Sequence, residues 1–141
     1  MILLAGSLKR AILECVDQSN PDLILLEGQS SLRNPSGPCG SEFILSGNAK
    51  SVIIVHPIGR QYFVDLEEFE YEIPDLIDEI KLIESYGAKI IGIGVNEENA
   101  TEEELIKFKN KYSQLLKIPV VLPLTDGVVE IVKNIKRNLS L

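Results

Sequence analysis

The chain has 141 residues, of which 45% are hydrophobic, a length and composition that suit one domain with a core that needs no disulfide or structural metal. Its formal net charge of −7 argues against a nucleic-acid partner, because affinity for the phosphate backbone comes mainly from Lys and Arg. No apolar stretch is long enough to span a membrane or to form the core of a signal peptide, so we expect a cytoplasmic protein with no membrane partner.

The pattern of apolar residues predicts helices and strands that alternate along the chain. Predicted strands are continuous apolar runs, typical of strands buried on both faces, and predicted helices carry apolar stripes near the 3.6-residue period. In chain order they are a helix with Leu4, Leu8, Ile12 and Cys15 or Val16 on one face, a strand at 23–27, a short helix around 41–45, a strand at 51–56, a helix with Leu76, Ile77, Ile80 and Ile83, a strand at 89–95, a helix with Leu105, Phe108, Tyr112 and Leu115, a strand at 119–122, and a last helix over about 127–138 with Val128, Val132, Ile135 and Leu139. This order predicts a single α/β domain over residues 1–141, with a mainly parallel sheet and helices on both faces.

Local signals mark the ends of several elements. Thr101 and Glu104 have the spacing of a capping box, and Gly87 is placed to end the preceding helix. Gly92 and Gly94 lie inside a predicted strand, where they indicate close packing of a helix. The chain contains no GxxxxGK[ST] loop and no GxGxxG after a strand, so we expect that it does not bind ATP tightly by itself.

Polar side chains follow the predicted strands at their carboxyl ends. These residues are Glu27, His56, Arg60 and Asn96. Because parallel strands end at one edge of the sheet, where open α/β folds bind ligands, we expect all four around one cleft. Glu27 and His56, the only histidine, are the candidate catalytic residues, and Arg60 suits a carboxylate or phosphate.

Structural roles are the alternative for each of these residues. Glu27 also fits a helix cap or a loop contact, His56 a hydrogen bond to a neighbouring loop, and Asn96 a contact that stabilises the loop after it. Five carboxylates between Asp65 and Glu72 match no calcium loop and are typical of a solvated face. The two cysteines lack CxxC spacing, so no metal site is predicted.

The run DLILLEGQSSL at 22–32 resembles the second half of an uncharacterised P-loop protein family that includes D-glutamate N-acetyltransferases. HPIGR at 56–60, GIGVN at 92–96 and IPVV at 118–121 match that family in the same order, so the resemblance covers nearly the whole chain. It implies a Rossmann-like, P-loop-type three-layer sandwich that is incomplete, because family members carry an amino-terminal domain and a glycine-rich phosphate loop before the matching region. The Glu27-Gly28 step is also similar to dethiobiotin-synthetase-like NTPases, in which that carboxylate lies near the metal and phosphates.

The resemblance implies a set of ligands and roles. It suggests N-acyl transfer to an amino acid, with ATP and magnesium or acetyl-CoA as possible ligands, and a domain that forms the nucleotide- or acyl-donor-facing wall of a site and is inactive alone. The turn Gly28, Gln29, Ser30 and Ser31 would hold an anion together with Arg60, and Asn96 would contact a heterocycle. The alternative is a non-catalytic binding or oligomerisation module; in either case we expect a homo-oligomer, because a missing strand leaves an apolar edge.

Overall fold

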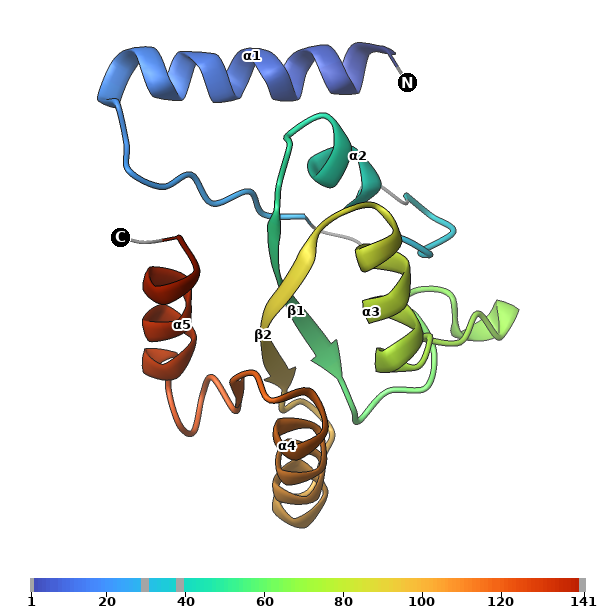
Figure 1. Cartoon of the computed structure of the whole chain (residues 1–141). Coiled ribbons are helices and arrows are strands. Elements are labelled where there is room, and N and C mark those ends of the chain that lie inside the picture. The colour runs from blue at the N-terminus through green and yellow to red at the C-terminus, as the bar shows by residue number, and fades with distance from the viewer. Residues whose placement is uncertain (1, 29–30, 38–39, 140–141) are drawn as a thin grey trace. The chain divides into compact units, whose positions relative to one another are not determined.

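The computed structural model describes residues 2–28, 31–37 and 40–139, which adopt an α/β fold with a mainly parallel, incomplete sheet (Figure 1). In chain order the elements are α1 (Ile2–Ser19), α2 (Gly40–Leu45), β1 (Ser51–Pro57), the short 3-10 helix η1 (Glu67–Phe69), α3 (Leu76–Ser85), β2 (Lys89–Asn96), α4 (Glu102–Leu116), β3 (Val120–Val121) and α5 (Val129–Leu139). Within these described ranges, no helix combines the length and the apolar character needed to cross a membrane.

Contacts group the chain into two compact units. The first consists of residues 1–50 and 79–89, and the second of residues 51–78 and 90–141. The first unit therefore holds α1, α2 and most of α3, whereas the second holds the sheet, α4 and α5. The single domain expected over residues 1–141 stays a prediction.

The predicted strand at 23–27 is wrong. This segment of the first unit has no regular secondary structure, and its side chains alternate between half-buried (Ile24, Leu26) and exposed (Leu23, Leu25). Leu25 is 74% exposed, which excludes burial on both faces. An apolar run has the side chains of a buried strand, but a strand also needs the backbone of a neighbouring strand to hydrogen-bond with. Among the described residues, the sheet contains only β1, β2 and β3.

An ion pair ties two segments of the first unit together. Arg33 Nε donates to Glu79 Oε1, and Glu79 on α3 is only 6% exposed. A buried carboxylate needs such a partner, because burial without one costs several kcal/mol, on the order of 3–5. The segment after residue 31 is thereby anchored to α3.

The sheet of the second unit confirms the other three predicted strands. Its order is β1-β2-β3; β2 and β3 are parallel, with Ile93 opposite Val120, and the arrows of β1 and β2 run in the same direction (Figure 1). β2 is the central strand, and its side chains from Ile90 to Val95 are buried, as a continuous apolar run predicts. The third strand is shorter than expected, at 120–121 rather than 119–122.

Helices α4 and α5 both contact β3. The capping box that starts α4 is confirmed, since Thr101 and Glu104 exchange hydrogen bonds. The predicted apolar face of α5 is wrong: Ile131 is its buried residue, whereas Val128 and Val132 are exposed. The reason is that α5 packs on Gly92 of β2, which has no side chain. Ile131 fills that space, since a Cβ added at Gly92 would lie 3.2 Å from Ile131 Cγ1.

Candidate functional site

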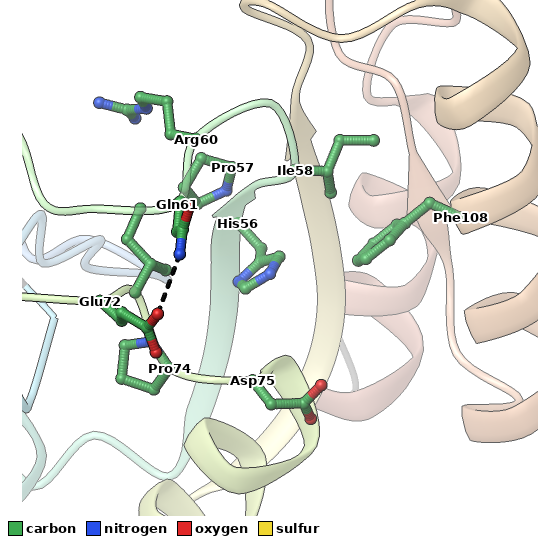
Figure 2. A pocket seen from close by; sticks show the side chains of 10 residues that line it. His56, Pro57, Ile58, Arg60, Gln61, Glu72, Pro74, Asp75 and Phe108 are labelled. Atoms are coloured by element: carbon green, nitrogen blue, oxygen red, sulfur yellow. Dashed lines mark hydrogen bonds between the residues drawn. The ribbon is translucent and has the colours of Figure 1, made fainter.

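A cavity of about 350 Å³ lies at the carboxyl end of β1 (Figure 2). All of its lining residues belong to the second unit. They are His56, Pro57, Ile58, Arg60, Gln61, Glu72, Ile73, Pro74, Asp75 and Phe108. The cavity is open to solvent and combines an imidazole, an arginine and two exposed carboxylates with an apolar wall.

One wall of the cavity is a short antiparallel pairing between two segments after β1. Ile73 N donates to Gln61 O at 2.8 Å, and Tyr62 and Glu72 form an isolated bridge. The side chain of Gln61 continues this pairing, because its Nε2 donates to Glu72 Oε1 at 3.0 Å (Figure 2). The Glu72 carboxylate is therefore held in a defined position at the cavity.

Gly59 allows the chain to turn into this wall. A Cβ at this position would lie 2.3 Å from Glu98 O and 2.5 Å from Asn99 C, in the loop that follows β2. No side chain fits a distance that short, and the atoms that it would meet belong to the backbone. The glycine in HPIGR is therefore required for close approach of two loops at the carboxyl edge of the sheet.

The imidazole of His56 is half-buried between polar and apolar neighbours. Its ring stacks on Phe108 of α4, with centroids 5.7 Å apart and planes at 12°. Burial lowers the pKa of His56 from its usual 6.5, because removal of water disfavours the imidazolium ion, while the negative charge of Asp75 acts in the opposite, raising direction. The net effect is a lowered pKa, so His56 is neutral at pH 7 and offers one ring nitrogen as a proton acceptor.

Asp75 has two functions in the structure. Its Oδ1 accepts a hydrogen bond from Ile77 N at 2.8 Å and so caps the start of α3, while its carboxylate lines the cavity below the His56 ring (Figure 2). Arg60 lines the cavity too, but its guanidinium points away from that ring (Figure 2). Within the described residues, the buried Arg60 Nε has no hydrogen-bond partner.

The other predicted site residues do not line this cavity. Asn96 Oδ1 accepts from Glu98 N at 2.9 Å, which is the loop contact given as its structural alternative. Glu27 and Gly28 are exposed residues of the first unit, so their expected convergence with His56 stays a prediction. Gln29 and Ser30 lie outside the described residues. The Ser31 hydroxyl, in the first unit, is buried without a hydrogen-bond partner among the residues that the structure describes.

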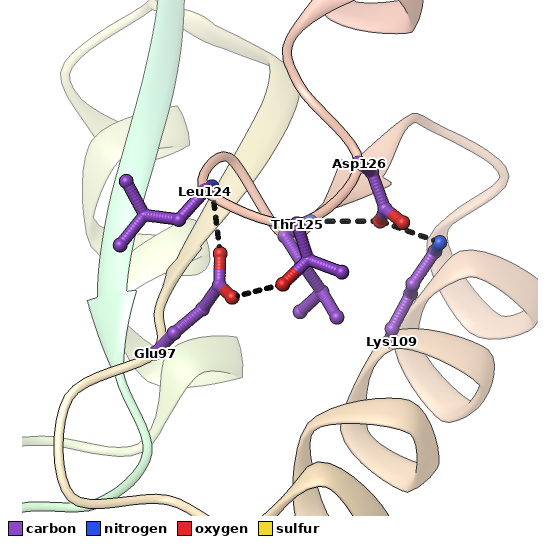
Figure 3. A network of polar contacts seen from close by, with 6 residues as sticks. Glu97, Lys109, Leu124, Thr125 and Asp126 are labelled. Carbon is purple, nitrogen blue, oxygen red and sulfur yellow. Dashed lines mark hydrogen bonds and ion pairs between the residues drawn. The ribbon is translucent and has the colours of Figure 1, made fainter.

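A second polar network lies between β2 and the loop after β3, in the second unit (Figure 3). Glu97 accepts from Leu124 N at 2.7 Å and from Thr125 Oγ1 at 2.6 Å, while Asp126 accepts from Lys109 Nζ at 2.7 Å and from Leu122 N at 3.1 Å. These hydrogen bonds lower the pKa of both carboxyl groups, that of Glu97 chiefly through Thr125 and that of Asp126 chiefly through Lys109. The network fixes the loop, since every one of these carboxylate contacts is internal.

Sequence reasoning missed four polar or aromatic residues of the cavity. They are Gln61, Glu72, Asp75 and Phe108. Phe108 belongs to the apolar stripe of its helix and Asp75 has the position of an N-cap, so each has a sufficient structural explanation in the sequence. In the described ranges no three His, Cys, Asp or Glu side chains are grouped to hold a metal ion.

Comparisons with known proteins agree with the resemblance of the motifs. The family described as a domain of unknown function, the DUF1611_C P-loop domain, matches residues 2–132. A D-glutamate N-acetyltransferase from Pseudoalteromonas sp. is 26% identical over 116 residues, which are 79% of this chain and 35% of that protein. The crystal structure of a DUF1611 family protein from Anabaena variabilis ATCC 29413 has the same fold, with a TM-score of 0.79 at 19% identity, over 95% of this chain and 40% of that one.

The chain thus spans between a third and a half of the length of both relatives. The match begins at residue 2 and includes the LLEGQSSL and HPIGR motifs, as well as every strand of the sheet. The chain therefore belongs to the DUF1611 family and corresponds to its carboxyl-terminal P-loop domain.

Proposed function

We propose that this domain forms one wall of a site for N-acyl transfer to an amino acid, and that His56 is the general base of the reaction. The observation that carries the proposal is the cavity at the carboxyl end of β1, which holds a neutral imidazole next to carboxylates. The name of the Pseudoalteromonas relative supports the choice of reaction, and parallel α/β sheets bind ligands at this edge.

The chemistry requires a base because an amino acid carries its nitrogen as an ammonium ion near pH 7. A ring nitrogen of neutral His56 takes a proton from that ammonium group, and the free amine then attacks the carbonyl carbon of a thioester. The new C–N bond forms as the C–S bond breaks, and the leaving thiolate takes the proton held by the imidazolium ion. The second proton that the nitrogen loses as it becomes an amide passes to solvent water. A correctly placed base of this kind contributes about 10²- to 10⁴-fold in rate.

One further predicted role belongs to this proposal. Arg60, which lines the same cavity as His56, binds a ligand carboxylate. Since the chain covers 35% of the acetyltransferase, we propose that the isolated domain does not catalyse transfer by itself.

The test uses the whole Pseudoalteromonas enzyme. We expect a histidine at its position corresponding to His56, and this histidine is changed to Gln. We expect kcat to fall about 10²- to 10⁴-fold, with the KM for the acyl donor little changed and the acidic limb of the pH profile removed. A surface glutamate of the same enzyme that lies outside the cavity, changed to Gln, is the control. An unchanged kcat in the histidine variant would overturn the general-base role.

A second candidate function is that of a binding or oligomerisation module. It is favoured by the unpaired apolar run at 23–26 of the first unit, where Leu25 is 74% exposed. Light scattering, together with the enzyme test, distinguishes the two candidate functions. A wild-type dimer that becomes a monomer in a Leu25→Ser variant supports assembly through this run. A monomer at high micromolar concentration contradicts it.

A further inference from the structure

We propose that the cavity beside His56 is the subsite of the acceptor amine, and that Glu72 and Asp75 make it select a ligand ammonium group over a phosphate. This inference rests on the proposed function and deepens it, since it assigns the described cavity to one of the two ligands of the reaction. The nucleotide or acyl donor then binds elsewhere along the site.

The charges around the cavity favour a cation. Two carboxylates, Glu72 and Asp75, line it together with a single cation, Arg60, whose guanidinium points away from the His56 ring (Figure 2). With His56 neutral, the lining carries one net negative charge. A nucleotide or coenzyme phosphate would be repelled by the two carboxylates, whereas an ammonium ion is attracted to both.

The hydrogen-bonding groups of the cavity also match an ammonium ion. A primary ammonium group has three N–H donors and no acceptor. The cavity offers acceptors on Glu72, Asp75 and the neutral ring of His56, so an ammonium ion that enters it meets the group that would remove its proton. Hydrogen bonds between an ammonium ion and a carboxylate are charge-assisted and therefore among the strong ones.

The two carboxylates are also positioned before any ligand binds. Gln61 Nε2 holds Glu72 Oε1 at 3.0 Å, and Ile77 N holds Asp75 Oδ1 at 2.8 Å. Each of these two hydrogen bonds engages one oxygen, and within the part of the chain that the structure describes the other oxygen of each carboxylate is left for a ligand. Arg60 then supplies the one cationic group for a ligand carboxylate, and an amino acid carries both complementary charges.

Calorimetry with this chain tests the inference directly. The ligands are D-glutamate, glutarate, N-acetyl-D-glutamate and coenzyme A. Glutarate lacks the amino group of D-glutamate, and N-acetyl-D-glutamate lacks the positive charge of that group. We expect D-glutamate to bind about 10-fold or more tightly than the other three. The NMR signals of the only imidazole should shift with D-glutamate, which locates the binding at His56.

Two charge-removing variants identify the recognition groups. Asp75→Asn keeps the cap on α3, because Asn is as good an N-cap as Asp, and Glu72→Gln keeps an acceptor for Gln61. Each should weaken D-glutamate binding about 10- to 100-fold and leave glutarate binding unchanged or stronger. Asp65→Asn is the matched control, since it removes the same charge from the second unit outside the cavity and should change nothing.

Three results would overturn the inference. They are D-glutamate binding that is insensitive to both variants, coenzyme A binding at His56 in preference to D-glutamate, and no D-glutamate binding at about 10 mM. Coenzyme A binding at His56 would leave the acyl-transfer site intact and place the donor in the cavity. A different combination is selective binding of the amine together with full activity of the histidine variant of the relative. It would show that His56 is not the general base, while the cavity remains the amine subsite.

Discussion

His56 at the end of β1 and Phe108 in the second turn of α4 are stacked with nearly parallel planes, at 12°, and with ring centroids 5.7 Å apart. Phe108 packs in turn on Tyr112 at 4.3 Å, and Tyr112 is buried. The candidate base is thus held by an aromatic pair that belongs to the core side of α4. The imidazole thus lies against an apolar ring, and burial of the imidazole lowers its pKa.

Phe108→Leu should raise the pKa of His56 toward 6.5. The substitution retains an apolar side chain but removes the flat surface that shields the imidazole, and burial is the main cause of the lowered pKa. A pH titration of the imidazole signals by NMR measures the effect in a protein with one histidine.

Ile106→Val is the control, because this residue of α4 is exposed. A pKa of His56 that stays the same or falls in Phe108→Leu would show that other groups exclude the water. The variant's cost in stability should be modest, about 1 kcal/mol, since the ring is half-buried.

His56→Gln should make the free energy of unfolding less dependent on pH in the acid range. Because the pKa of His56 is lowered by folding, the unfolded chain takes up the proton first as the pH falls below about 6.5. The stability that comes from the neutral imidazole is therefore present above the unfolded pKa and is lost as the pH falls through the folded pKa.

Urea unfolding of wild type and variant at a series of pH values between about 7 and 5 measures this difference. The unfolding free energies of wild type and variant should converge as the pH falls. The variant should show a smaller change of unfolding free energy with pH, because it lacks the contribution of the histidine. A wild-type protein that gains stability relative to the variant on acidification would mean that folding raises the pKa of His56.

The sequence predicted three of the four strands and the helices around them, since those elements have both the apolar period and neighbours to pack on. It failed at 23–27 because a buried strand also needs a partner strand, which no local pattern reveals. It failed on the face of α5 because Gly92, far along the chain, decides which side chain docks. In the cavity, His56 and Arg60 were accessible as strand-end residues, whereas Asp75 and Phe108 have ordinary local explanations and come together only in three dimensions.

Gly59→Ala should destabilise the protein and disturb the cavity. A Cβ at this position would lie 2.3 Å from Glu98 O, and neither backbone can move away cheaply. We expect a loss of about 1–3 kcal/mol or more, measured by urea unfolding. Gly37→Ala is the matched control, because no atom lies within 4 Å of its added Cβ. Equal stabilities of the two variants would show that the loops at the carboxyl edge adjust to each other.

Glu97→Ala should release the loop after β3 while the sheet remains folded. Its carboxylate accepts hydrogen bonds from Leu124 N and Thr125 Oγ1, so the substitution removes two bonds that hold the loop. Hydrogen exchange of the Leu124 amide should therefore become faster.

The same loop should respond to pH in the wild type. Because these bonds lower the pKa of Glu97, the stability that they contribute is present above the unfolded pKa of about 4.5 and is lost as the pH falls through the folded pKa. The same exchange should therefore quicken in the wild type at low pH, after correction for intrinsic rates. Ile93 N, which donates to Pro119 O in the sheet, is the internal reference. Equal protection of Leu124 in variant and wild type, or a parallel loss at Ile93, would mean that Glu97 does not act on the loop alone.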